Sequence, residues 1–178
     1  MIYDLRIKIE DLRIGLLKLV LLKLEFMAFS LSKLFGNKTS EPQSSTNDTI
    51  EAIITDVENK PFGVSEKNVL FAGLNELGGY FFFQTVIVGQ LNVKSKTGAQ
   101  LYFMGENFEL QLESDMPEFE SDRSNIKGRH LTKIDFEVEE SDIKKLENAT
   151  LKSMQLKVKN HDILFRKHVV VGALDEEE

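Results

Sequence analysis

Apolar residues recur every three or four positions along the first 36 residues, which is the spacing of one face of an α-helix. This stripe consists of Ile2, Leu5, Ile9, Leu12, Leu16, Val20, Leu24, Met27, Leu31 and Leu34. The opposite face is mostly charged, although Leu22 and Phe29 interrupt it. Gly36-Asn37 supplies a helix stop, since glycine readily takes the left-handed conformation that ends helices. The pattern therefore predicts an amphipathic helix over residues 1–36, with a competing strand-like alternation only at residues 5–10.

The pattern changes completely after this segment. Residues 37–49 read NKTSEPQSSTNDT, a polar tract that contains Pro42 and no apolar residue. Such a composition is typical of a flexible linker. We therefore expect a separate body that begins at about Ile50.

Residues 50–173 alternate between apolar and polar positions in short runs separated by turn signals, which predicts strands with one buried face. The expected strands are residues 50–57, 80–93, 100–104, 108–113, 131–139, 151–159 and 163–171. Residues 65–77 fit either a short helix or a further strand, and Ser141 is expected to cap a short helix through Glu147. About seven short strands with regular turns predict a mainly β domain, an antiparallel β-sandwich, over residues 50–173. The acidic tail at 174–178 is expected to be solvated.

Charge divides the chain in the same place as hydropathy. The formal net charge is −7. Residues 1–38 carry seven basic and four acidic side chains, so that segment is +3 and the remainder is −10. An acidic body argues against nucleic acid as a partner, because that binding depends on neutralising phosphates. The chain has no cysteine, which excludes disulfides and thiolate metal sites.

No pattern of catalytic residues stands out. There is no nucleophile elbow, phosphate-binding loop or dinucleotide fingerprint. His161 and His168 lie near each other in sequence, but no third ligand has the spacing of a zinc site. We therefore predict a non-enzymatic protein with no catalytic residues, no cofactor and no metal.

A long polar loop is expected over residues 114–129, and long loops on rigid scaffolds often carry recognition. Its charged residues are Asp115, Glu118, Glu120, Asp122, Arg123, Lys127 and Arg129. We expect the three basic residues to pair locally with the acidic ones. The loop is the predicted partner-binding surface of the body.

The apolar stripe of residues 1–36 must be buried against a membrane surface, another copy of the chain, or the protein's own body. A transmembrane span over residues 14–35 is disfavoured. Its thirteen large apolar residues contribute roughly −4 to −8 kcal/mol to insertion, whereas Lys18, Lys23 and Glu25 cost roughly +8 to +10 kcal/mol. An in-plane helix, with Lys18 and Lys23 at the headgroups, avoids that cost.

The leading hypothesis is thus a binding or assembly protein. Its helix docks to a membrane surface and its β-domain recognises a partner. We expect it in the cytoplasm, with the docking helix attaching it peripherally at the inner face of a membrane. The alternatives are a homo-oligomer assembled through the helix, and a helix folded back on the β-domain as a structural cover.

Overall fold

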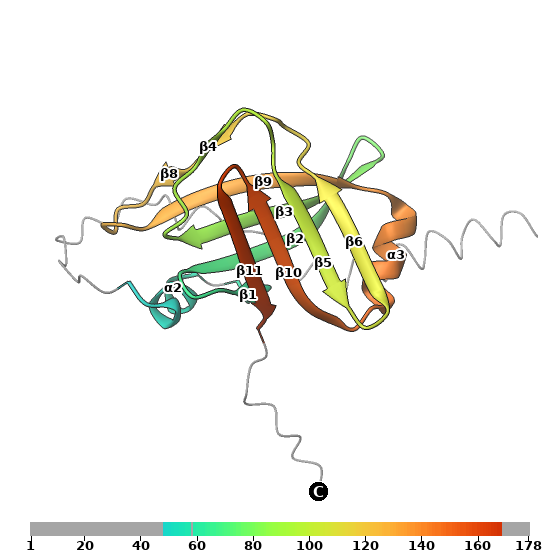
Figure 1. Cartoon of the computed structure of the whole chain (residues 1–178), viewed down its shortest axis with the longest axis horizontal. Helices are drawn as coiled ribbons and strands as arrows, with labels where there is room; N and C mark the ends of the chain where they lie inside the picture. The colour runs from blue at the N-terminus through green and yellow to red at the C-terminus, as the bar shows by residue number, and fades with distance from the viewer. Residues whose placement is uncertain (1–47, 58, 169–178) are drawn as a thin grey trace, which may run out of the picture.

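The computed structural model describes residues 48–57 and 59–168, and these form a mainly β domain (Figure 1). The elements are α2 (Ile50–Asp56), β1 (Gly63–Val64), β2 (Asn68–Leu77), β3 (Tyr80–Gly89), β4 (Lys94–Ser95), β5 (Gln100–Gly105), β6 (Phe108–Glu113), β7 (Phe119–Glu120), β8 (Asp122–Arg123), β9 (His130–Val138), α3 (Glu140–Asn148), β10 (Leu151–Val158) and β11 (His161–Lys167). Nine strands make one sheet in the order β6-β5-β10-β11-β1-β2-β3-β9-β8. Strands β4 and β7 form a separate two-stranded ladder. All the pairings are antiparallel.

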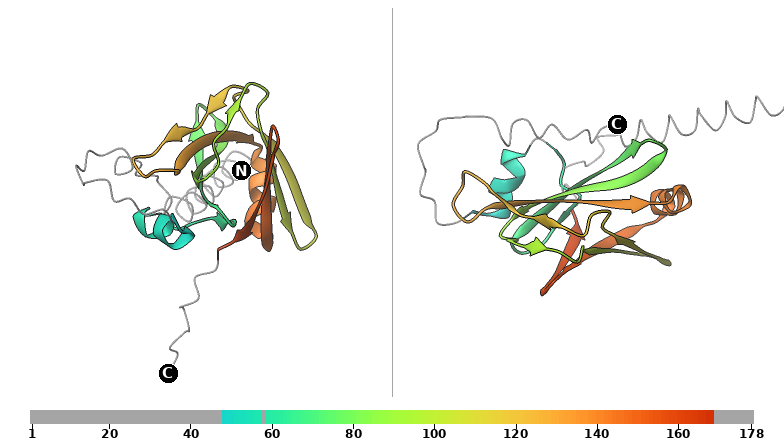
Figure 2. Two further views of the ribbon diagram at one scale, coloured as in Figure 1. Left: turned by 60° about the vertical axis from the view of Figure 1, so that its left-hand side comes forward. Right: turned by 90° about the horizontal axis from the view of Figure 1, so that it is seen from above.

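The large sheet curls until its two ends approach each other (Figure 2). An isolated bridge joins Ser114, just after β6, to Phe136 of β9. Beside it, the amide of Asp115 donates to the carbonyl of Asp135 at 2.8 Å. Beyond this bridge α3 contacts β6 and places Ile143 and Leu146 in the core, so the helix covers the gap where the sheet ends diverge.

The prediction of a mainly β, antiparallel fold is confirmed, but the predicted sandwich is wrong. A sandwich needs two stacked sheets, whereas the main strands here belong to one twisted sheet that curls into a half-barrel. Alternation in a sequence fixes which residues face inward. It does not fix whether the opposing wall is a second sheet or the far end of the same sheet.

The concave side of the sheet holds the larger core. Phe83 lies near its centre, with its ring edge-to-face to Phe62 at 5.4 Å and to Phe103 at 5.2 Å between centroids. Phe103, Phe136 and Phe165 are fully buried in the same cluster. In β9 the inward residues Ile134, Phe136 and Val138 alternate with exposed polar ones.

The convex side carries a second, smaller core under α2. Ile53 of this helix packs with Val69 and Phe71 of β2 and with Val86 and Val88 of β3. The predicted strand over residues 50–57 is therefore wrong. Thr49 caps the helix by accepting from the amide of Ala52 at 3.2 Å. The apolar residues at 50, 53, 54 and 57 have helical spacing, which puts them on the side facing the sheet.

Most of the other predicted strands are confirmed. Residues 108–113 match β6, and β9, β10 and β5 agree with their predictions to within one residue at either end. Residues 65–77 contain strand β2 and no helix, and the strand expected over 80–93 ends at Gly89. The predicted short helix is α3, but its N-cap is Glu139 and not Ser141.

The amphipathic helix predicted over residues 1–36, most of the predicted linker and the acidic tail lie outside the described residues. Within residues 48–57 and 59–168, no helix is long and apolar enough to cross a membrane.

Candidate interaction site

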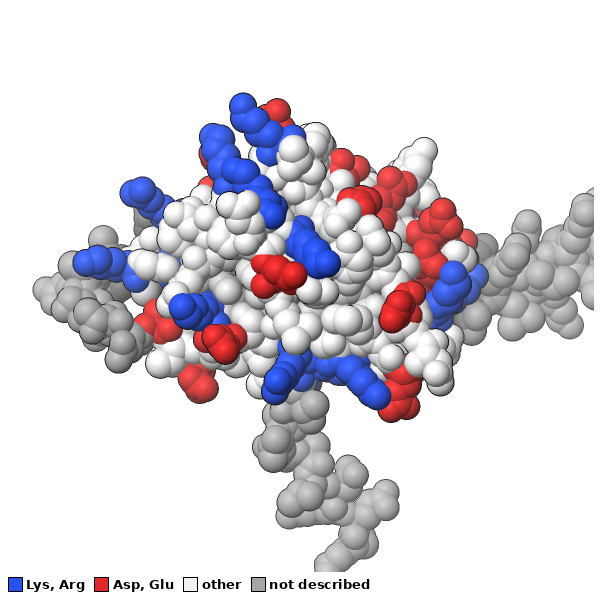
Figure 3. Space-filling view, viewed as in Figure 1, with Lys and Arg blue, Asp and Glu red and all other residues white. Residues whose placement is uncertain are grey.

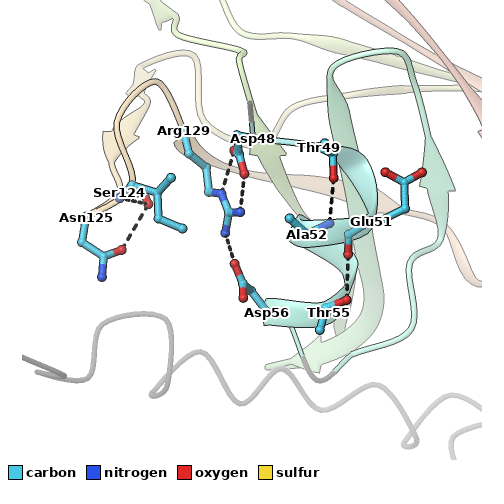
Figure 4. Close-up of polar contacts among 10 residues, drawn as sticks. Asp48, Thr49, Glu51, Ala52, Thr55, Asp56, Ser124, Asn125 and Arg129 are labelled. Carbon is cyan, nitrogen blue, oxygen red and sulfur yellow. Dashed lines mark hydrogen bonds and ion pairs between the residues drawn. The ribbon is translucent and has the colours of Figure 1, made fainter. Parts of the chain in front are cut away.

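A buried arginine holds the beginning of the described chain against the body. The Nε atom of Arg129 donates to Asp48 at 2.8 Å, and Nη2 donates to the second oxygen of the same carboxylate. Nη1 donates to Asp56, the last residue of α2, at 2.7 Å (Figure 4). One guanidinium therefore binds a residue just before α2 and a residue at its end.

The three partners differ sharply in exposure. The Arg129 side chain is 4% exposed and that of Asp48 11%, whereas the Asp56 side chain is 48% exposed. Burial tends to lower the pKa of Arg129, but the hydrogen bonds to Asp48 and Asp56 outweigh it and raise the pKa above its ordinary value. The guanidinium therefore stays charged. Its bidentate bond to Asp48 is the geometry in which arginine and carboxylate bind most strongly.

Local turns place the two halves of this ion network. The amide of Arg129 donates to Ile126 at 3.1 Å, and the Ser124 amide donates to the Arg129 carbonyl at the same distance. Gly128 takes φ +86° in this tight loop, a conformation that glycine adopts without strain. On the other side, the Thr49 cap fixes the first turn of α2. The loop that holds Arg129 and the Thr49 cap of α2 therefore together fix the position of Asp48.

Arg129 was expected to pair with the acidic residues of its own loop, and the structure shows a different pairing. Its partners lie 81 and 73 positions earlier in the chain. In the predicted organisation Asp48 belongs to the linker and Asp56 has no assigned role. A helix-capping threonine directly after an aspartate, followed by apolar residues at helical spacing, is the signal that could have placed Asp48 on the body.

The remaining residues of the predicted binding loop are solvent-exposed, but the segment is more ordered than a simple loop. Glu120 lies in β7 and pairs with Lys94 of β4 at 2.6 Å. Asp122 and Arg123 form β8 and pair with Leu131 and His130. The other members of the set are Asp115, Glu118 and Lys127, all exposed. The predicted recognition role of these residues stays a prediction.

A second notable surface is the outer face of the β2–β3 hairpin, away from the concave core. Leu77 and Tyr80 face each other across the Gly78-Gly79 turn and are 69% and 62% exposed. Asn75 and half-buried Phe82 form the next pair on that side. We call these four residues the hairpin face. Both turn glycines have positive φ, which is the geometry that tight two-residue hairpins require.

Charge is unevenly distributed over the surface. In Figure 3 acidic side chains gather at the end of the molecule where β6, α3 and the hairpin tip lie, while basic side chains are prominent toward β4 and β8. On β9, exposed Asp135 and Glu137 pair in register with Gln84 and Phe82 of the hairpin. The hairpin face thus has acidic neighbours.

The predicted residues of the helix interface lie outside the described residues, and the structure does not place them. They are Leu5, Ile9, Leu12, Leu16, Val20, Leu24, Met27, Leu31, Leu34, Lys18 and Lys23. Among residues 48–57 and 59–168, no group of three or more His, Asp or Glu side chains is arranged to hold a metal ion.

No protein-family model matches the chain, and no match is found among curated proteins or solved structures. The function is therefore inferred from the arrangement of the chain's own residues.

Proposed function

We propose that this protein is a non-enzymatic binding protein that attaches to an anionic membrane surface through residues 1–36 and presents its β-domain to a partner. The observation that carries the proposal is the buried bidentate pair between Arg129 and Asp48. It fixes the point at which the N-terminal segment joins the body. Because this junction is fixed, a helix attached to the membrane would join the β-domain at a defined point on its surface.

The composition of the segment suits a surface helix. Its apolar stripe would lie on one face of a helix, and its six basic residues include Lys18 and Lys23. A basic residue close to an anionic bilayer contributes about 1 kcal/mol to binding, and the apolar face adds to this by entering the headgroup region. The acidic body opposes association through its own charge. Binding is therefore expected to depend on lipid charge and on salt.

The test is flotation of the intact chain with lipid vesicles. We expect the chain to float with phosphatidylcholine vesicles that contain phosphatidylserine, and to float less with phosphatidylcholine alone. High salt should weaken the binding, since the Debye length falls to about 3 Å at 1 M. A chain that stays unbound with both kinds of vesicle contradicts the proposal.

A matched pair of charge reversals locates the contact. Lys18→Glu lies on the N-terminal segment and Lys127→Glu lies on the exposed loop before β9, and each changes the net charge by the same amount. Lys18→Glu should reduce flotation strongly, whereas Lys127→Glu should leave it near the value of the unmodified protein. Equal losses would show that overall charge governs binding, which contradicts attachment through residues 1–36.

A further inference from the structure

The hairpin face continues the small core that α2 covers. In register along β2 and β3, the covered pairs Val69–Val88 and Phe71–Val86 are followed by Gly73–Gln84 and then by the hairpin face. The part of the sheet on which α2 packs ends before this point. Among the described residues, Phe82 belongs to neither core cluster, although its ring is half-buried.

An exposed apolar surface joined to a core is a common mark of an interaction site. Leu77 and Tyr80 together present such a surface at the tip. Gly73 lies between the hairpin face and the covered cluster and is buried, so the exposed surface begins with the Asn75–Phe82 pair. These features suit a long apolar helix lying along the hairpin.

The chain itself supplies a segment of that kind close by. Residues 1–47 join the body at Asp48, directly before α2, which packs on the same side of the sheet. From Val69 to Leu77 the hairpin extends about 26 Å at roughly 3.3 Å per residue. Residues 37–47 reach up to about 36 Å when extended, and a helix over residues 2–35 would be about 50 Å long. The segment is therefore long enough to cover the hairpin face of its own molecule.

Charge favours the same pairing. Residues 1–38 carry a net charge of +3. Asp135 and Glu137 of β9 are exposed and lie on the same side of the sheet as the hairpin face, in register with Gln84 and Phe82. Opposite charges at the edges of an apolar contact fix orientation and suppress wrong partners.

We propose that, away from a membrane, residues 1–36 dock on the hairpin face of the same molecule and bury their apolar stripe against Leu77, Tyr80 and Phe82. A membrane surface and the hairpin face would then compete for the same apolar stripe of residues 1–36. This inference goes beyond the proposed membrane attachment and does not depend on it. It assigns a resting position to the segment whether or not lipid is its final partner.

The absence of cysteine allows a direct test in the full chain, because an introduced thiol is unique. Asn75→Cys places a thiol on the hairpin face without removing its apolar side chains. Met116→Cys is the matched control, since Met116 is 62% exposed, like Tyr80, and lies outside the hairpin. The rate of alkylation by iodoacetamide is measured for each thiol without lipid.

We expect Asn75→Cys to react roughly tenfold more slowly than Met116→Cys, as it would if the docked form held about nine-tenths of the molecules. Adding Leu16→Asp and Leu24→Asp, which charge the stripe, should bring the two rates together. Adding Leu22→Asp and Phe29→Asp, which place the same charges on the opposite helical face, should leave Asn75→Cys slow. The far-UV circular dichroism spectrum of each charged variant, recorded beside that of the unmodified protein, verifies that the β-domain remains folded.

Three results would overturn the inference. The first is equal reactivity of the two thiols in the unmodified background, and the second is a slow rate at Asn75→Cys that survives the charged stripe. The third is slow labelling that disappears on dilution, which would assign the face to a second copy of the chain. If the protein floats with vesicles but Asn75→Cys is not labelled slowly, only the docking proposal is contradicted. If Asn75→Cys is labelled slowly but the protein does not float, only the proposal of membrane attachment is contradicted.

Discussion

Arg129 and Asp48 form a bidentate ion pair across 81 positions of the sequence, with an Nε–carboxylate distance of 2.8 Å and an Arg129 side chain that is 4% exposed. This pair joins the loop before β9 to the residue that precedes the N-cap of α2. The same guanidinium also binds Asp56 at the end of that helix. The junction between the N-terminal segment and the domain is therefore a buried, charged contact.

Removing the Asp48 carboxylate should destabilise the domain more than removing that of Asp56. Asp48→Ala leaves Arg129 buried with one partial partner, and breaking a buried ion pair from one side costs on the order of 3 kcal/mol. Asp56 is 48% exposed and accepts one bond, so Asp56→Ala should cost about 1 kcal/mol or less. Urea unfolding of the two variants measures the difference.

Arg129→Met provides the control for that comparison. Methionine removes the buried charge and keeps apolar volume, which leaves no unpaired guanidinium in the interior. Its free energy of unfolding should therefore lie closer to that of the unmodified protein than the value for Asp48→Ala. An Asp48→Ala variant no less stable than Asp56→Ala would show that Asp48 is not the principal partner.

Gly89 and Gly78 provide a matched pair for the backbone. Gly89 has φ +149°, and an added Cβ would lie 2.2 Å from the Lys67 carbonyl oxygen. Gly78 also has positive φ, but no described atom lies within 4 Å of the Cβ position. We expect Gly89→Ala to cost on the order of 3 kcal/mol through clash and strain. Gly78→Ala should cost about 1 kcal/mol, because only the unfavourable positive φ of alanine contributes and no clash is added.

Thermal unfolding separates these two variants. Equal losses of stability would show that the approach of the β2 backbone to Gly89 has no energetic consequence. The close approach itself explains why β3 ends at this glycine, because the next residue turns to donate from its amide to the Lys67 carbonyl.

The inner core should depend on Phe83 more than on its neighbour Phe82. Phe83 is 4% exposed and makes edge-to-face contacts with Phe62 and Phe103. Truncation of a buried phenylalanine to alanine costs about 3–5 kcal/mol, because transfer and cavity terms add. Phe82→Ala, on the opposite side of β3, should cost clearly less. Equilibrium denaturation that ranked Phe82→Ala as the more damaging change would contradict the assignment of the two faces.

The pair Lys94–Glu120 should hold the β4–β7 ladder only within a limited pH range. The hydrogen bond to Lys94, with its charge, lowers the pKa of Glu120 below the ordinary 4.5, and Glu120 raises the pKa of Lys94 above 10.5. The contribution of Glu120 is complete above 4.5 and is lost as the pH falls through its lowered pKa. The contribution of Lys94 is complete below 10.5 and is lost as the pH rises through its raised pKa.

Carboxyl titration by NMR checks this pair. The Glu120 midpoint should move back toward 4.5 in Lys94→Met, because both the hydrogen bond and the positive charge are gone. The effect on global stability should be small, since both side chains are exposed. A Glu120 midpoint that does not change in Lys94→Met would mean that the contact is not populated in solution.

Several strands could be predicted from the sequence because one of their faces is buried. In β6 the inward residues Phe108, Leu110 and Leu112 alternate with exposed Glu109, Gln111 and Glu113 without interruption. A one-residue change of register there would turn the whole apolar set outward, so the pattern and the strand coincide. The same reasoning applies to β9 and β10.

Two features could not be predicted, for different reasons. A short run such as residues 50–57 fits a buried strand as well as a helix turn, and its packing on β2 decides between them. The partnership of Arg129 with Asp48 and Asp56 depends on tertiary contacts over more than 70 positions. Local charge spacing around Arg129 instead indicated partners in its own loop.

The most direct measurement of the central claim, attachment through the apolar stripe, compares two charged double variants of the intact chain on anionic vesicles. Leu16→Asp with Leu24→Asp charges the stripe, and Leu22→Asp with Phe29→Asp adds the same charge to the opposite helical face. We predict that the second variant retains distinctly more flotation than the first, because both lose the same attraction to the anionic bilayer but only the first also loses the apolar stripe. Equal flotation of the two variants would contradict attachment through the stripe.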